Sequence, residues 1–322
     1  MKPAAALVAL LLAACARSPI PSPSWSPTDP AWTPVASQSR PVGLGVPGGV
    51  RLAPGSRFAG GAEILAAPDG RLHSLSDLKL ADGDIVVVSD WGDLFRARLR
   101  LDRRGRLAGV DDWRMRPLTG DDGLPFPSKS DGDAEGLAIT DDGRMLVSFE
   151  GRHRIRDYGP LDQPDVTPKP LKAPELGAPG NSGFEGMATA PGGWRVAAEA
   201  GGVWDCRPAA CTAVVAPPGE PLPDSEYRIT GLDRDPAGAG WFVVERRFRE
   251  PADVRGRVRR MDASGALGPV LIELTLPSTV DNFEGIAAVA LNGATRLYIL
   301  SDDNGSARQR TLLLAFDVTP AR

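Results

Sequence analysis

The stretch that determines the fold is Glu-Gly-Leu-Ala-Ile-Thr-Asp-Asp-Gly-Arg-Met-Leu-Val-Ser-Phe-Glu, at residues 135–150. It opens with Glu-Gly and apolar residues, passes through Asp142-Gly143, and continues as an apolar run that ends in Glu150. Asp-Gly pairs supply the positive φ that tight hairpin turns need. The stretch therefore predicts a β-hairpin with an acid at each end.

The same pattern recurs along the chain. Close copies begin at residues 185 and 284, and looser copies begin at 77 and 230, so with residue 135 the spacings are 58, 50, 45 and 54. Each copy continues through a turn signal into an apolar run that ends in an acid: Asp90, Glu150, Glu199, Glu245 and Asp302. Repeats of about 50 residues, each with about four strands, are typical of β-propeller blades.

The repeats predict an all-β chain with a single β-propeller domain over residues 37–322. Five repeats are visible, and the last stops about 38 residues after its start. N-terminal strands within residues 42–66 are therefore expected to close the ring and join the two ends of the domain. The pattern leaves the number of blades at five or six.

The N-terminal residues look like an export signal. Lys2 precedes a short apolar run that is too short for a membrane-spanning helix, which needs about 20 residues. Leu-Ala-Ala-Cys, ending at Cys15, resembles the bacterial lipobox, in which the cysteine is lipidated. We therefore expect a signal peptide at 1–14 and, at 15–36, the lipidated Cys15 with a Pro/Ser-rich tether. Ala16 in place of Asp favours the outer membrane, facing the periplasm; the alternative is an ordinary signal peptide with an incidental cysteine.

Cys206 and Cys211 flank a short Arg-Pro-Ala-Ala loop. A hairpin would set the two cysteines opposite each other, within bridging distance. Outside the cytoplasm the disulfide is favoured over the reduced pair. The sequence therefore predicts a disulfide between them.

Composition excludes several classes of function. The formal net charge of -4 argues against nucleic acid as a partner, which normally calls for a basic surface. Two histidines and three cysteines are too few for a zinc finger or a His-rich zinc enzyme. The sequence has no Gly-x-Ser-x-Gly motif and no P-loop motif.

Propeller geometry predicts a cluster of carboxylates. The start of the first strand and the end of the second lie at the same edge of a blade, so the acids of all repeats should share one mouth of the central channel. Oxygen ligands of this kind favour a divalent cation such as Ca²⁺. The expected metal ligands are Glu135, Glu185, Glu284, Asp90, Asp302, Asp303 and Asn304. The alternative is that Glu-Gly only helps blades to pack.

Cationic residues follow several of these acids. The predicted catalytic groups are Glu150 or Glu245 as general base, Arg152, Arg246 and Arg247 to stabilise negative charge, and His153 as an acid for the leaving group. The alternative is a network of ion pairs that joins blade to blade.

The motifs together resemble the bacterial phytase-like family, also called esterase-like activity of phytase. The resemblance covers roughly residues 55–320 and implies a propeller in the cell envelope with hydrolase activity. It rests on the Glu-Gly-[Leu/Met/Ile]-Ala copies, residues 148–155, 243–248 and 301–304, and Gln309–Leu313. The matching positions are Asp77, Asp90, Glu135, Glu150, Arg152, His153, Arg154, Glu185, Glu245, Arg246, Arg247, Glu284, Asp302, Asp303, Asn304 and Arg310. Gly151 departs from an Arg expected directly after the acid.

Three functions remain open at this point. The first is a calcium-assisted hydrolase of phosphate or carboxylic esters acting on a small anionic or ester substrate. The second is a non-catalytic envelope propeller that binds a ligand or a protein, and the third is a lactonase-type hydrolase. In each case we expect a monomer attached to the membrane through lipid at Cys15, with no nucleic-acid partner.

Overall fold

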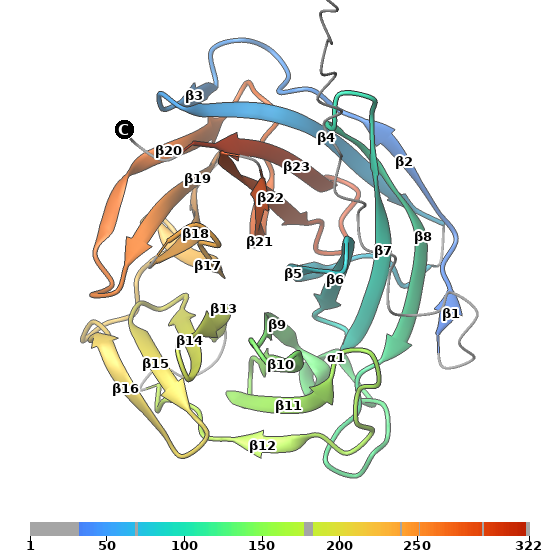
Figure 1. The fold of residues 1–322 in the computed structure, drawn as a ribbon, viewed down its shortest axis with the longest axis vertical. Coiled ribbons are helices and arrows are strands. Elements are labelled where there is room, and N and C mark those ends of the chain that lie inside the picture. Colours follow the sequence, from blue (N-terminus) through green and yellow to red (C-terminus); the bar gives the residue numbers. More distant parts are fainter. Residues whose placement is uncertain are drawn as a thin grey trace, which may run out of the picture.

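Five groups of antiparallel strands surround a central axis in the computed structural model, which describes residues 32–67, 70–176, 183–238, 240–250, 252–291 and 293–319 (Figure 1). Four groups take their strands in chain order from the axis outward. Blade 1 consists of β5 (Leu75–Ala81), β6 (Asp84–Ser89), β7 (Asp93–Leu101) and β8 (Leu107–Pro117), and blade 2 of β9 (Ala134–Ile139), β10 (Arg144–Phe149), β11 (Arg154–Pro160) and β12 (Lys169–Leu171). Blade 3 consists of β13 (Phe184–Ala190), β14 (Gly193–Ala198), β15 (Val203–Arg207) and β16 (Ala210–Val215). Blade 4 consists of β17 (Arg228–Arg234), β18 (Gly240–Arg249), β19 (Asp253–Asp262) and β20 (Leu267–Thr275).

Blade 5 joins the two ends of the domain. Its inner strands are β21 (Asn282–Leu291), β22 (Ala294–Asp302) and β23 (Thr311–Val318), and its outer strand is β4 (Ser56–Ala66), which pairs antiparallel with β23. The expected closure by N-terminal residues is therefore present, and it leaves five blades. A single parallel bridge between Gly60 and Leu107 links β4 to blade 1.

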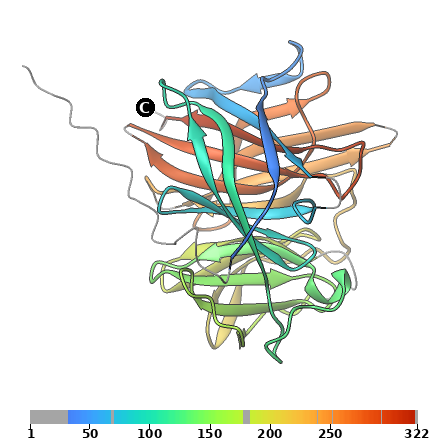
Figure 2. The ribbon, with the colours of Figure 1, turned by 90° about the vertical axis from the view of Figure 1, so that its right-hand side faces the viewer.

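Three short strands from the N-terminal side lie outside the blades. β1 (Thr33–Pro34) pairs with β8, β2 (Ser37–Pro41) pairs with β4, and β3 (Val50–Leu52) pairs with β20. The side view shows the first of these segments running across the outer strands of blade 1 (Figure 2).

The end of the expected tether packs on the propeller. Trp32 is buried among Val86, Leu94 and Leu118 of blade 1, because a large indole removes much apolar surface from water there. Residues 1–14, Cys15 and the rest of the tether lie outside the described residues.

The hairpin turns follow the residues that predicted them. Between β5 and β6, Ala81 pairs with Asp84, so Asp82 and Gly83 alone form the turn. Both have positive φ, 52° and 86°, which Asp tolerates and Gly adopts freely.

The hydrophobic core is divided among the junctions between blades. Each of the five apolar clusters combines residues of two neighbouring blades, such as Val147 of blade 2 with Val88 of blade 1. Burial between blades stabilises the ring without filling its axis, so polar groups are free to occupy the axis.

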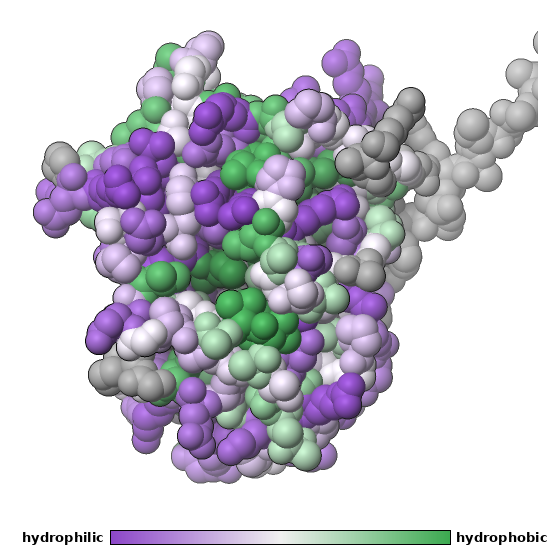
Figure 3. Space-filling view, turned by 90° about the vertical axis from the view of Figure 1, so that its left-hand side faces the viewer, coloured by the Kyte–Doolittle hydropathy of each residue, from purple (hydrophilic) through white to green (hydrophobic). Residues whose placement is uncertain are grey.

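The outer surface of the ring is mostly polar. Seen from the side of blades 3 and 4, apolar side chains gather near the middle of this face (Figure 3). Among the described residues, no helix is long and apolar enough to cross a membrane.

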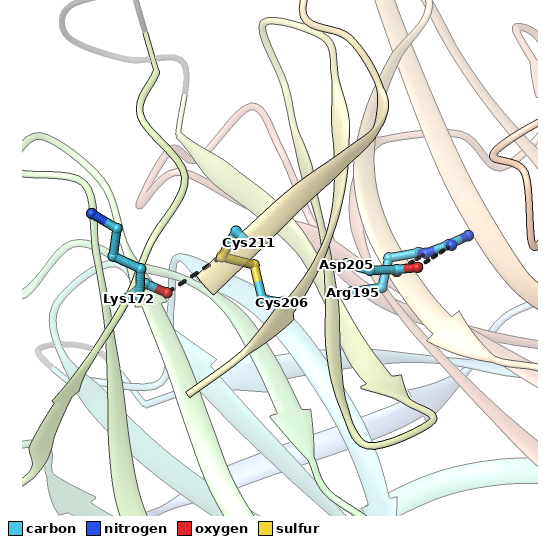
Figure 4. The surroundings of a disulfide bond; sticks show 5 residues. All are labelled: Lys172, Arg195, Asp205, Cys206 and Cys211. Atoms are coloured by element: carbon cyan, nitrogen blue, oxygen red, sulfur yellow. Dashed lines mark hydrogen bonds and ion pairs between the residues drawn. A yellow bond between two sulfur atoms is a disulfide. The ribbon is translucent and has the colours of Figure 1, made fainter. Parts of the chain in front are cut away.

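The disulfide between Cys206 and Cys211 is present, and it links paired positions of β15 and β16 (Figure 4). Replacing both cysteines with serine is expected to lower the free energy of unfolding by about 2 kcal/mol, since the short loop they close restricts the unfolded chain. Urea denaturation measures this loss. Dithiothreitol should destabilise the wild type by a similar amount and leave the double variant unchanged; equal stability of the two proteins under oxidising conditions would contradict the prediction.

Candidate functional site

Each blade carries a β-bulge at the same end of its innermost strand. The pairing of the first and second strands skips one residue, as it does at Glu135 between Ala134 and Gly136. A bulge of this kind redirects the side chain of the skipped residue. The five skipped residues, here called the bulge ring, are Ser76, Glu135, Glu185, Thr230 and Glu284.

A second ring lies at the end of the second strand. In each blade, one residue of the second strand pairs with the residue just before the bulge, as Phe149 pairs with Ala134 in blade 2. The residue that follows it in the chain, Glu150 in blade 2, lines the same mouth. The five residues of this strand-end ring are Asp90, Glu150, Glu199, Arg246 and Asp302. The structure thus arranges ten positions in two stacked rings, with four acids and one arginine in the second.

The register corrects the expected placement in two blades. In blade 4, Glu245 pairs with Ile229, so Arg246 takes the ring position that was expected for Glu245. In blade 1, Asp77 pairs with Val88, so Ser76 takes the position expected for Asp77. The acid lies one residue before the ring position in blade 4 and one residue after it in blade 1, and only the strand pairing reveals this difference.

All ring residues except Thr230 line a cavity of about 280 Å³, here called the mouth cavity. Residues outside the rings complete its wall: Lys129 on the single-turn helix α1 (Lys129–Gly132), Asp224, Arg228 and Asn304. The cavity is lined by three cationic side chains and eight carboxylates, which are Asp90, Glu135, Glu150, Glu185, Glu199, Asp224, Glu284 and Asp302.

Three carboxylates stand close enough to share one cation. Asp133, Glu135 and Glu150 each offer an oxygen, and these oxygens lie within 4.8 Å of one another. The backbone N–H of Gly183 donates to Glu150 Oε1 at 3.0 Å, which fixes that side chain. The three residues form an acidic triad with the donor chemistry of a hard divalent cation.

Burial and like charge disturb the titration of these groups. Burial, followed by the charges of Glu185 and Glu284, raises the pKa of Glu135 well above its usual value. The pKa values of Glu185 and Glu284 are likewise raised well above the usual value, first by burial and then by neighbouring carboxylates. Burial raises the pKa of Glu150 to about 7. An added cation would relieve this unfavourable charge.

The cationic side chains neutralise only part of the mouth. Arg228 and Arg246 each approach Glu199 Oε1 at 2.7 Å. Lys129 lies 2.9 Å from Asp90 and 2.8 Å from Asp133 of the acidic triad. Arg246 is also 3.7 Å from Glu284. Within the described residues, Glu135, Glu150 and Glu185 form no ion pair, so the negative charge concentrates on the side of blades 2 and 3.

Several predicted site residues lie away from the cavity. Glu245 forms an ion pair with Arg257 at 2.7 Å, and Arg247 forms one with Asp253 at 3.0 Å. Asp303 accepts a hydrogen bond from the hydroxyl of Thr311. Arg152 pairs with Asp131 on the surface, and His153 contacts Phe184 edge-to-face. The predicted residues that do line the cavity are Asp90, Glu135, Glu150, Glu185, Arg246, Glu284, Asp302 and Asn304.

A buried ion pair lies on the innermost strand of blade 1. Lys79 Nζ donates to Asp77 Oδ2 at 2.7 Å and to the carbonyl of Ile286 in blade 5 at 3.2 Å. Asp77 Oδ2 also accepts the N–H of Leu137 in blade 2 at 2.9 Å. The pair therefore ties blade 1 to both of its neighbours.

Comparison with known proteins gives one family. The family model described as "Phytase-like: Esterase-like activity of phytase" matches residues 70–305. No curated protein matches the sequence.

Solved structures resemble the chain only weakly. They include virginiamycin B lyase from Staphylococcus aureus (12% identity, TM-score 0.42, covering 88% of this chain and 100% of that one). A putative gluconolactonase gives 13% identity and a TM-score of 0.45 over 91% of this chain and 96% of that one. BamB from Moraxella catarrhalis is 13% identical, with a TM-score of 0.33, over 89% of this chain and 99% of that one. At these values the likenesses carry no argument about function.

Proposed function

Because the chain belongs to the phytase-like family, described as esterase-like activity of phytase, we propose that it hydrolyses phosphate or carboxylic esters in the mouth cavity with the help of a divalent cation. The observation that supports this most directly is the acidic triad of Asp133, Glu135 and Glu150, of which Glu135 and Glu150 line the mouth cavity.

The donor set fits Ca²⁺ best among common cations. The triad offers carboxylate oxygens only, and Asp90 Oδ1 is a further buried oxygen that no described group hydrogen-bonds. Such oxygens suit a hard cation with an adaptable coordination shell. When bound, the cation would supply Lewis-acid polarisation of the ester.

The remaining side chains divide the other tasks. Arg246 and Arg228 face the cavity from blade 4 and would bind the anionic group of the substrate and its developing negative charge. Glu185 lies outside the triad and has no hydrogen bond or ion pair to a described residue. It is therefore the carboxylate placed to accept a proton from the attacking water.

An assay with and without metal tests the proposal. Release of 4-nitrophenol from 4-nitrophenyl phosphate and 4-nitrophenyl acetate is expected, with loss on adding EDTA and recovery with excess CaCl₂. Turnover that persists unchanged in EDTA contradicts the role of the cation. Calcium binding by calorimetry without turnover of either ester, or of gluconolactone, would favour the non-catalytic binding function instead; turnover of gluconolactone alone would favour the lactonase.

We also propose that the protein is a lipid-anchored monomer at the outer membrane, facing the periplasm. The Leu-Ala-Ala-Cys motif ending at Cys15 supports the anchor. Cys15→Ser is expected to move the protein from the membrane fraction to the soluble periplasmic fraction. Unchanged membrane association of this variant would contradict the anchor.

A further inference from the structure

A wide groove opens beside the mouth cavity, between blades 5 and 1. Its volume is about 880 Å³, against about 280 Å³ for the mouth cavity. The two share Asp90, Lys129 and Asn304 in their walls. A molecule held in the mouth cavity by one end therefore has room to extend into the groove.

The groove displays an indole at its edge. Trp91 directly follows Asp90 of the strand-end ring, and it is 44% exposed, whereas every other tryptophan among the described residues is at most 6% exposed. The residues at the same place in the other blades are Gly151, Ala200, Arg247 and Asp303. Blade 1 alone places a large flat side chain there.

The surrounding contacts hold Trp91 in place. Its peptide lies in a tight turn in which the N–H of Gly92 donates to the carbonyl of Ser89 at 2.9 Å. The carbonyl of Gly92 then accepts the N–H of Leu118 at 2.8 Å. The ring of His73 meets the indole edge-to-face, with centroids 5.7 Å apart. The turn positions the Trp91 peptide and His73 supports one edge of its indole, which reduces the conformational entropy that the side chain loses when a ligand binds.

Most charged groups in the rest of the groove are paired. Glu63 pairs with Arg40 at 2.9 Å, Lys129 with Asp90 at 2.9 Å, and Arg310 with Asp281 at 3.3 Å. Gln309 and Asn304 offer uncharged amides. An apolar flat surface with a few polar neighbours is characteristic of sites for small organic rings.

We propose that this groove holds the alcohol part of the ester, and that this part carries a flat ring that stacks on Trp91. The inference rests on the proposed function, since the ester group would sit in the mouth cavity. In the reaction, water oxygen bonds to phosphorus or to the acyl carbon, the bond to the alcohol oxygen breaks, and the alcohol takes up a proton. The ring-bearing alcohol is then left in the groove as product.

Two ligands with the same anionic group isolate the contribution of the ring. Benzylphosphonate and methylphosphonate resist hydrolysis, and calorimetry in CaCl₂ gives both dissociation constants. We expect the wild type to bind benzylphosphonate about tenfold more tightly, as aromatic stacking and burial of the ring suggest. Trp91→Ala should remove this preference, Trp91→Phe should retain most of it, and Leu124→Ala, at an exposed loop residue, should leave it unchanged.

Free 4-nitrophenol separates this inference from the proposed function. Saturable binding of 4-nitrophenol should survive Glu135→Gln and be lost in Trp91→Ala. If neither phosphonate binds but 4-nitrophenol does so in this pattern, the groove inference stands and the proposed hydrolysis of phosphate esters is weakened. A preference for benzylphosphonate that persists in Trp91→Ala, or no saturable binding of 4-nitrophenol, would overturn the inference. Displacement of 4-nitrophenol by methyl glucoside, whose ring is puckered, would contradict a flat ring as the occupant.

Discussion

Glu135→Gln is expected to abolish calcium-dependent ester hydrolysis, with a fall in kcat/KM of at least about 100-fold. Glu135 belongs to the acidic triad and to the bulge ring. Since loss of groups that merely orient metal ligands costs up to about 100-fold, loss of a ligand itself should cost at least as much. Initial rates with 4-nitrophenyl esters at saturating CaCl₂ measure the effect.

The same variant should become more stable when calcium is absent. Burial and neighbouring carboxylates raise the folded-state pKa of Glu135 well above its value of 4.5 in the unfolded chain. Above pH 4.5 the unfolded chain therefore loses this proton first, and folding stability falls as the pH rises. Glutamine carries no such charge, so in EDTA at pH 8 the variant should unfold at higher urea concentration than the wild type.

A matched substitution distinguishes the loss of a metal ligand from the loss of any buried carboxylate. Glu273 also carries a buried carboxylate, but it pairs with Arg51 at the outer edge of blade 4. Glu273→Gln should keep both the activity and its dependence on calcium. Full activity of Glu135→Gln would remove the acidic triad from the mechanism.

Asp77→Ala is expected to destabilise the fold by about 3–5 kcal/mol, the usual range when one member of a buried ion pair is removed. The side chain of Lys79 is 4% exposed, and Asp77 is its carboxylate partner. The change would leave a buried ammonium and free the N–H of Leu137. Urea denaturation in the presence of CaCl₂ measures the loss.

The double variant Asp77→Ala/Lys79→Met tests the cause. Removing the ammonium as well should recover part of the lost stability, since no unpaired ammonium then remains, while Asp233 loses the nearby positive charge of Lys79. If the double variant is no more stable than Asp77→Ala alone, the ion pair is not what the first substitution disrupts.

The sequence predicted the propeller because its repeats carry both the turn residues and the apolar runs of each blade. It also predicted that Glu135, Glu185 and Glu284 share one mouth, since residues at equal places in equal blades must do so. The pattern could not show which residue each bulge displaces. In blade 4 the acid that ends the apolar run falls one residue early, so the pattern indicated Glu245, whereas the strand pairing brings Arg246 to the ring.

Groups outside the repeat were harder to find. The segment between blades 1 and 2 has no counterpart in the repeat pattern, yet it supplies Lys129 to the mouth cavity and Asp133 to the acidic triad. Trp91 follows a predicted acid directly, but its exposure depends on the turn at Gly92 and on the neighbouring blade. Such contacts depend on tertiary packing, which no local pattern encodes.

The pairing of β4 with β23 has a consequence for biosynthesis. Glu63 and Leu312 are partners although 249 positions separate them, so the final blade waits for nearly the whole polypeptide to be made. Contacts this distant slow folding. A prematurely terminated chain would leave a sheet edge unpaired, and its mouth cavity would lack Glu284 and Asp302, the two carboxylates that blade 5 supplies.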